Sequence, residues 1–209
     1  MFDALVFDLD GTLWDASEAC AVGWNKGLHS LALGKVITAE DIKKVTGRPT
    51  AECVQILFPE ESRQFQNLLS VLCDYEEEAI KRLGGKVYDS VNETLRLLAQ
   101  GCDLFLVSNC KDWYLDAFMD FSGLGGLFKG CDCHGKSDMD KPEMLRRLRD
   151  THKFTQPVYI GDTPGDEESA REAGYRFVHA RYGFGDAFKP DYSIDSFGDL
   201  LTIIPNTAI

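Results

Sequence analysis

The chain has 209 residues, 44% of them hydrophobic, which suffices for one large domain, or for a domain with a smaller insertion, and for a sizeable core. Its 34 acidic side chains outnumber the 22 basic ones, and the formal net charge is -12. Because such a chain repels phosphate backbones and anionic lipids, we expect neither nucleic acid nor a membrane surface as a partner.

The seven cysteines are odd in number and scattered along the chain, which is not the pattern of a disulfide framework. We interpret them as reduced thiols. No apolar stretch reaches the roughly 18 residues of a membrane span, and the N-terminus has no basic segment of the kind that opens a signal peptide. These features predict a cytoplasmic protein.

The first predicted element is a buried strand over residues 4–9, "ALVFDL", and a long helical segment follows it. Residues 15–85 show helical periodicity and no convincing strand, which predicts four or so helices. We therefore expect an all-helical insertion at residues 15–85 in a core made of residues 1–14 and 86–209. Its hinges would be the turn after the first strand and the glycine pair at 84 and 85.

Three more apolar runs of strand length follow, and helical stretches separate the later ones. This alternation predicts an α/β fold with a parallel Rossmann-like sheet, buried between two layers of helices. The C-terminal segment from Gly183 onward predicts an edge strand and a short helix. Ligands of such sheets bind beyond the carboxyl ends of the strands, where Asp8, Ser108 and Asp162 stand. The three runs are residues 103–109, 157–162 and 175–180, and the clearest helices are residues 141–152 and 164–173.

Asp8 and Asp10 follow one another closely at the end of the first predicted strand. Two carboxylates about 4 Å apart repel by roughly 4 kcal/mol at an effective dielectric constant near 20, and Asp162 and Asp166 add further acids at another strand end. Such a cluster needs a cation or a shared proton. Hard oxygen ligands suit Mg²⁺, which completes its coordination with water and substrate phosphate. The alternative is that Asp10 and Gly11 only form a tight turn.

The other polar motifs also have purely structural interpretations. Thr163 could cap a helix whose first turn holds Asp166, Ser108 and the following asparagine could cap the next helix, and Lys141 could merely begin another. Any one of these motifs can arise by chance. The four motifs nevertheless occur in order, each at a predicted strand end or just beyond it, and this order favours a shared site.

With these motifs the sequence resembles the haloacid-dehalogenase-like superfamily of hydrolases over essentially its whole length. "DLDGTL" at residues 8–13 is similar to the first motif of that family, Ser108 to the second, Lys141 to the third and "GDTPGD" at residues 161–166 to the fourth. Lys136 is the alternative for the third motif. The helical insertion resembles the helical type of cap domain in this family.

The resemblance implies a role for each acidic residue. Asp8 would be the nucleophile that forms an aspartyl phosphate, and Asp10 the general acid and base. Mg²⁺ would be bound by the Asp8 carboxylate, the Asp10 backbone carbonyl and Asp162, with Asp166 acting through water or as an orienting group. The groups that bind substrate phosphate oxygens would be Gly11, Thr12, Ser108, Asn109 and Lys141.

The acid at position 10 also narrows the predicted reaction. Family members that cleave carbon–halogen bonds lack an acid there, which favours phosphate esters. Sugar phosphomutases of similar layout carry a histidine early in the cap, where this chain has Cys20 and no histidine before His29. The sequence thus predicts a magnesium-dependent phosphatase for a phosphomonoester of a small metabolite, similar to phosphoglycolate phosphatases. The alternatives are a phosphomutase and a non-catalytic phosphate-binding regulatory protein.

For three further features the sequence allows two interpretations each. Arg48, in the polar turn "TGRPT", could bind an anionic group of the substrate or be a solvated loop residue. Trp14 could line the substrate entrance or pack under the cap. "CDCH" at residues 131–134 could suggest a soft-metal site, but it lacks a second ligand pair, so an edge strand is the preferred interpretation.

Overall fold

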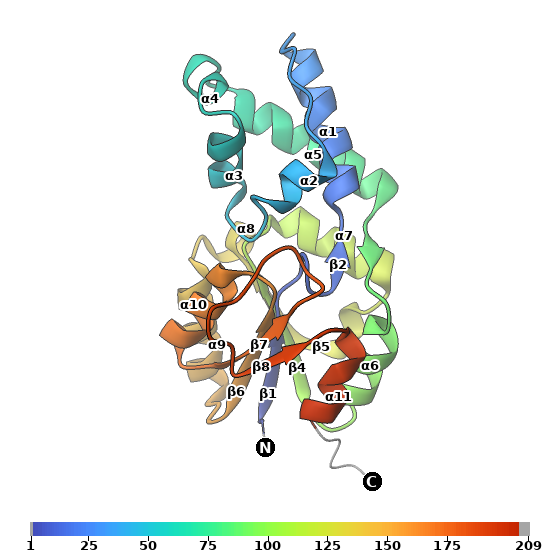
Figure 1. Cartoon of the computed structure of the whole chain (residues 1–209), viewed down its shortest axis with the longest axis vertical. Helices are drawn as coiled ribbons and strands as arrows, with labels where there is room; N and C mark the ends of the chain where they lie inside the picture. The colour runs from blue at the N-terminus through green and yellow to red at the C-terminus, as the bar shows by residue number, and fades with distance from the viewer. Residues whose placement is uncertain (1, 205–209) are drawn as a thin grey trace.

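Six parallel strands form the central sheet of the computed structural model, which describes residues 2–204 (Figure 1). Across the sheet the order is β5-β4-β1-β6-β7-β8. The predicted α/β fold with a Rossmann-like parallel sheet is therefore confirmed; residues 1 and 205–209 of the predicted core lie outside the described part. The strands are β1 Ala4–Phe7, β4 Asp103–Ser108, β5 Phe128–Cys133, β6 Pro157–Gly161, β7 Arg176–Ala180 and β8 Tyr192–Ile194.

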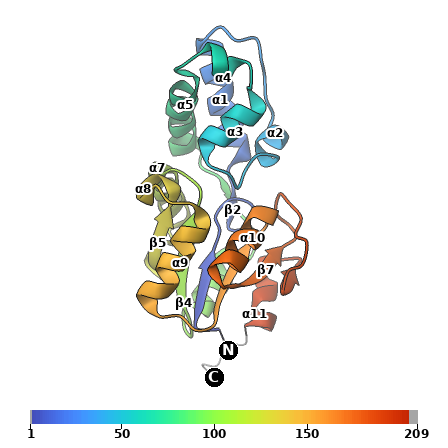
Figure 2. The same cartoon turned by 90° about the vertical axis from the view of Figure 1, so that its left-hand side faces the viewer.

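Helices cover both faces of the sheet, because neighbouring residues of a buried strand point to opposite sides. In β1, Val6 packs with the apolar faces of α9 and α10, whereas Phe7 packs with residues of α6, α7 and α11. Figure 2 views the molecule from the side of α9 and α10. These helices are α6 Val91–Leu98, α7 Asp112–Ser122, α9 Lys141–His152, α10 Pro164–Ala173 and α11 Leu200–Ile203, with shorter turns at α8 His134–Ser137, η1 Gly125–Leu127 and η2 Phe197–Asp199.

The predicted helical segment holds five helices, which gather beyond the carboxyl ends of the strands (Figure 1). The two long helices, α1 and α5, pack against each other, and Gly23 of α1 lies so close to α5 that a Cβ would approach the Tyr75 carbonyl oxygen to 2.6 Å. The helices are α1 Ser17–Ser30, α2 Ala39–Lys43, α3 Thr50–Leu57, α4 Glu61–Gln64 and α5 Leu68–Leu83.

The two chain crossings between the helical segment and the sheet pair with each other. β2 (Trp14–Asp15) and β3 (Lys86–Val87) form a two-stranded antiparallel ribbon that the sequence analysis did not predict. Gly85 precedes β3 without room for a side chain, since a Cβ there would lie 2.8 Å from the Trp14 ring and 2.9 Å from the Ala16 Cβ atom. The ribbon therefore depends on this glycine.

The predictions for the sheet edges are confirmed. Residues 128–133 form β5 at one edge, which agrees with the strand interpretation of "CDCH", and the C-terminal segment supplies β8 and α11 at the other. Within residues 2–204 no helix combines the length and the apolar character that a membrane crossing requires.

Gly85→Ala is expected to lower stability by about 1–3 kcal/mol, since overpacking forces the Trp14 ring or the backbone to move. Gly126→Ala is the matched control, because a Cβ at Gly126 meets nothing within 4 Å and should change stability by less than about 1 kcal/mol. Thermal unfolding followed by circular dichroism would compare them. Equal melting temperatures for the two variants would contradict the tight packing at Gly85.

Candidate active site

The carboxyl ends of three neighbouring strands meet at the centre of the sheet. From β1 the chain runs outward through β4 to β5 at one edge and then returns to β6, beyond which β7 and β8 follow toward the other edge. The strand order thus reverses beside β1, which is the point where α/β folds bind ligands. Asp8 follows β1, Ser108 ends β4 and Asp162 follows β6, and all three are buried. The sequence-predicted residues are thus brought together at this end of the sheet.

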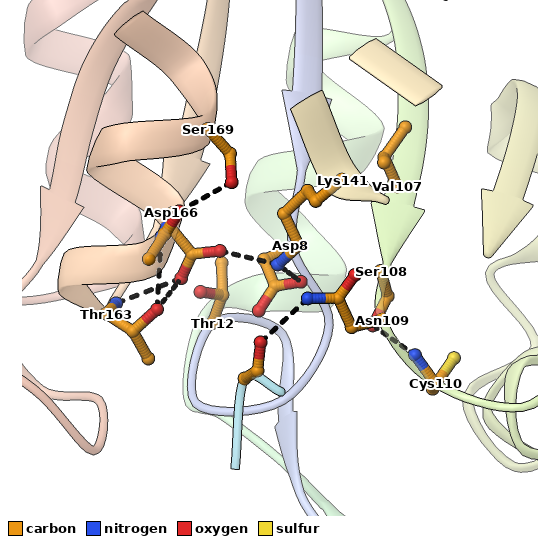
Figure 3. Close-up of polar contacts among 12 residues, drawn as sticks. Asp8, Thr12, Val107, Ser108, Asn109, Cys110, Lys141, Thr163, Asp166 and Ser169 are labelled. Atoms are coloured by element: carbon orange, nitrogen blue, oxygen red, sulfur yellow. Dashed lines mark hydrogen bonds and ion pairs between the residues drawn. The ribbon is translucent and has the colours of Figure 1, made fainter. Parts of the chain in front are cut away.

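Lys141 is the buried cation of the site. It is the first residue of α9, whose N-cap Asp140 accepts a hydrogen bond from the Glu143 backbone. The Lys141 ammonium donates to Asp8 Oδ1 at 2.9 Å and to Asp166 Oδ1 at 2.5 Å (Figure 3). Lys136, the alternative from the sequence, is exposed. The geometry therefore favours Lys141.

Three buried carboxylates, Asp8, Asp162 and Asp166, bring oxygen atoms within 4.8 Å of one another. Burial, and then the Asp166 charge, raise the pKa of Asp8 to about 6 despite the opposing effect of Lys141. Burial and the neighbouring carboxylates also hold the pKa of Asp162 well above its usual range. One lysine does not balance three carboxylates, and a set of hard oxygen donors suits Mg²⁺. The residues present therefore fit this ion.

The backbone around Asp162 is shaped for close approach. Gly11 has a φ of +76°, and a Cβ there would lie 2.1 Å from Asp162 Oδ2. A Cβ on Gly183 would lie 2.2 Å from the Asp162 Cβ. The Phe184 N–H donates to Asp162 Oδ2 at 2.7 Å. The loop after β7 was not predicted to reach the site, because its glycines look like ordinary turn residues.

Asp166 of "GDTPGD" both caps a helix and contacts the buried lysine of the site. Its Oδ2 atom accepts hydrogen bonds from the Thr163 N–H and hydroxyl, while the Thr163 hydroxyl accepts from the Asp166 N–H, which is a capping box at the start of α10. Its Oδ1 atom faces Lys141. The cap thereby fixes the carboxylate that orients the lysine.

Asp10 points to a different partner from the three clustered carboxylates. The Tyr114 hydroxyl of α7 donates to Asp10 Oδ1 at 2.5 Å. Burial raises the pKa of Asp10 to about 8; the Tyr114 hydrogen bond opposes this shift, and the charges of Asp8 and Glu76 add to it. A carboxyl group with such a pKa can hold a proton near neutral pH. The sequence analysis missed Tyr114, which lies 104 residues away along the chain.

Three of the predicted phosphate-binding residues, Thr12, Ser108 and Asn109, lie around Asp8 (Figure 3). The Thr12 hydroxyl donates to Asp162 Oδ1 at 3.3 Å, and the Ser108 hydroxyl oxygen accepts from the Cys110 N–H at 3.4 Å. Asn109 donates from Nδ2 to the Gly47 carbonyl oxygen at 2.8 Å, which links the sheet to the helical segment (Figure 3). The Asn109 Oδ1 atom is buried without a partner among the described residues.

Asp8 and Asp10 line one pocket together with residues of the helical segment. Arg48 lines it, although its guanidinium donates to the Val45 carbonyl oxygen at 3.2 Å. Trp14 does not line it: this fully buried ring packs edge-on against Tyr114, in agreement with packing under the helices. The further lining residues from the helical segment include Ser17, Cys20, Trp24, Thr46, Cys53 and Glu76.

The family model described as haloacid dehalogenase-like hydrolase matches residues 5–180. The chain belongs to this family. The match spans the first strand, the helical segment and the acidic motif before α10, so it includes all four motifs on which the resemblance rests. The predicted family and the hydrolase class are confirmed.

Curated relatives extend the similarity over almost the whole chain. A phosphoglycolate phosphatase of Aquifex aeolicus is 25% identical, with 97% of this chain and 96% of the relative covered. A phosphoglycolate phosphatase of Salmonella typhimurium is 27% identical, covering 94% and 90%. These relatives indicate that the enzyme is a phosphatase of this family.

A solved structure shares the fold. A predicted phosphoglycolate phosphatase from Haemophilus somnus superposes with a TM-score of 0.86 at 23% identity and covers 97% of both chains. The likeness extends through the helical segment, so the whole fold is one already known in this family.

In Asp10→Asn, stability is expected to fall less steeply with rising pH than in the wild type. The folded protein holds the Asp10 proton up to about pH 8, whereas the unfolded chain loses it near pH 4, so the stability of metal-free protein falls across this interval. Asparagine has no such proton. Melting temperatures in a chelator between pH 5 and 8 would test this, with the exposed Asp186→Asn as the control. An equally steep fall in Asp10→Asn would contradict the prediction.

Proposed function

We propose that the protein is a magnesium-dependent phosphatase that hydrolyses a phosphomonoester of a small metabolite through an aspartyl phosphate on Asp8. The observation that carries this proposal is the Lys141 ammonium bound to both Asp8 and Asp166 at a strand switch point. A buried lysine in this place orients the Asp8 carboxylate. The neighbouring acid, Asp10, does not contact this lysine and has a different environment. Family membership supports the same reaction.

Asp8 would attack the phosphorus atom as the nucleophile. Lys141 fixes one carboxylate oxygen of Asp8, and the Tyr159 hydroxyl approaches the same atom at 3.3 Å. Because both contacts are to Oδ1, the other oxygen is left for the reaction. Attack forms an acyl phosphate and expels the leaving oxygen, so one difficult displacement becomes two easier ones.

Asp10 acts as general acid and then as general base. With a pKa near 8 it holds a proton that the leaving oxygen can take. The resulting carboxylate then removes a proton from the water that attacks the acyl phosphate. Tyr114 orients Asp10 through its hydrogen bond.

Three carboxylates and one backbone carbonyl form the proposed metal site. Mg²⁺ would be held by Asp8, Asp162 and the Asp10 backbone carbonyl, with Asp166 acting through water or as an orienting group. When bound, it supplies positive charge beside the phosphate. Lys141 adds a second positive charge, and the remaining phosphate contacts would come from Gly11, Thr12, Ser108 and Asn109.

Residues 15–85 would form a cap that determines which substrate enters. The hydrogen bond from Asn109 to Gly47 joins this segment to the residue after β4, so a closed cap and a formed phosphate site are coupled. Arg48 would contact an anionic group of the substrate. Cys20, which lines the pocket, occupies the place where mutases of this layout carry a histidine, and this favours a phosphatase over a mutase.

The first experiment measures phosphate release from a panel of small phosphorylated metabolites and an aryl phosphate, with and without Mg²⁺. Release is expected only with the metal, and Asp8→Asn should reduce it about a thousandfold or more, since the variant lacks the nucleophile. Asp186→Asn provides the matched control. Metal-independent release, or full activity in Asp8→Asn, would refute the proposed mechanism. Binding without release would indicate a regulatory protein, and transfer to a second sugar hydroxyl a mutase.

Tyr114→Phe is expected to move the alkaline limb of the kcat/KM profile upward by about one pH unit. The Tyr114 hydrogen bond stabilises the charged form of Asp10 and lowers its pKa, so its loss raises the pKa of the acid by an amount worth one hydrogen bond to a charged group. Tyr175→Phe is the control, because Tyr175 donates to Leu145 far from Asp10. An unchanged limb would show that Tyr114 does not act on Asp10.

A further inference from the structure

Glu76 is a buried acid that the proposed reaction does not use. It lies on α5, its residue is 8% exposed, and it lines the pocket that also contains Asp8 and Asp10. Asp10, Cys20 and Tyr114 line the same pocket as Glu76, and the Glu76 charge raises the pKa values of all three. Its own pKa is raised by burial.

The Glu76 carboxylate has no cationic side chain paired with it among residues 2–204. No lysine or arginine nitrogen of this part of the chain lies within 4 Å of its oxygen atoms. Trp24, Cys20 and Lys111 lower its pKa as the nearest favourable groups, yet the Trp24 indole nitrogen itself remains unpartnered. The nearest donors of this buried carboxylate are thus an indole N–H and a thiol, and no cation is paired with it. A hydroxyl or ammonium group of a ligand in the pocket would stabilise it further.

The position of Glu76 defines which part of a substrate it would meet. A phosphate at Asp8 directs its leaving oxygen to Asp10, the acid that protonates it. Because Glu76 and Asp10 line the same pocket, a group that extends from that oxygen toward α5 comes near the Glu76 carboxylate. A hydroxyl or ammonium group there can donate a hydrogen bond to it, whereas a carboxylate meets a like charge.

We propose that Glu76 is a specificity-determining residue that accepts a hydrogen bond from a hydroxyl or ammonium group on the leaving group and disfavours a carboxylate at that position. This inference rests on the proposed phosphatase function. It separates the substrate of this chain from phosphoglycolate, after which its relatives are named. Arg48, which also lines the pocket, would then serve a group other than the one beside Glu76.

The test uses three two-carbon phosphomonoesters that differ in one terminal group: 2-phosphoglycolate, 2-hydroxyethyl phosphate and phosphoethanolamine. We expect the wild type to have a lower kcat/KM for phosphoglycolate than for at least one of the other two. Glu76→Gln should raise the ratio of the kcat/KM for phosphoglycolate to the kcat/KM for 2-hydroxyethyl phosphate at least tenfold. If Glu76→Gln loses more kcat/KM with phosphoethanolamine than with 2-hydroxyethyl phosphate, ammonium is the preferred donor. If the two losses in kcat/KM are equal, the preferred donor is a hydroxyl group.

Glu78→Gln is the matched control. It makes the same change on the same helix at an exposed residue that pairs with Lys26, so the ratio should change less than twofold. Glu76→Asp keeps the charge and should keep the wild-type order of substrates. Melting temperatures check folding, and Glu76→Gln should melt no lower than the wild type because it removes a buried charge.

The outcomes separate the two proposals. An unchanged ratio in Glu76→Gln, or a wild type that prefers phosphoglycolate, would overturn the role of Glu76 while leaving a phosphatase. If the wild type releases no phosphate from these esters or from an aryl phosphate in the presence of Mg²⁺, the proposed function fails and the inference fails with it.

Discussion

The buried contact of Lys141 with Asp8 and Asp166 organises the centre of the molecule. It joins the end of β1, the start of α9 and the start of α10, which are far apart in the sequence. Removing one member of a buried ion pair costs about 3–5 kcal/mol, because a charge is left without a partner. The three side chains therefore help to hold the sheet and these two helices in their relative positions, and the same contacts fix the geometry around Asp8.

Several residues contribute to the fold and to the site with different atoms. One oxygen of Asp166 caps α10 and the other orients Lys141, and Gly11 provides both a left-handed turn and room for the Asp162 carboxylate. The structural and the functional interpretations of these motifs are thus not alternatives. A short motif that ends a strand or begins a helix can be held in one conformation by the same bonds that orient its reactive group.

Much of the site could be predicted from sequence, because Asp8, Ser108 and Asp162 each follow a recognisable strand and parallel strands bring their carboxyl ends together. What could not be predicted depends on tertiary contacts. Tyr114 and Glu76 stand on amphipathic helices whose periodicity identifies a buried face but not the residue that it meets. The ribbon of β2 and β3 was missed because two-residue strands are too short to show a period. The fold class was therefore predictable, but the environment of Asp10 was not.

The pairing of Asp15 with Lys86 has a consequence for the way in which this architecture can change. Paired strands run about 5 Å apart, so the polypeptide enters and leaves the helical segment at nearly the same point. A segment whose two ends lie side by side can be lengthened, shortened or exchanged without moving the strands that hold Asp8 and Asp162. The distance between its two attachment points to the core stays the same whatever its length. The same residues of the sheet can in this way be combined with many different inserted segments above them.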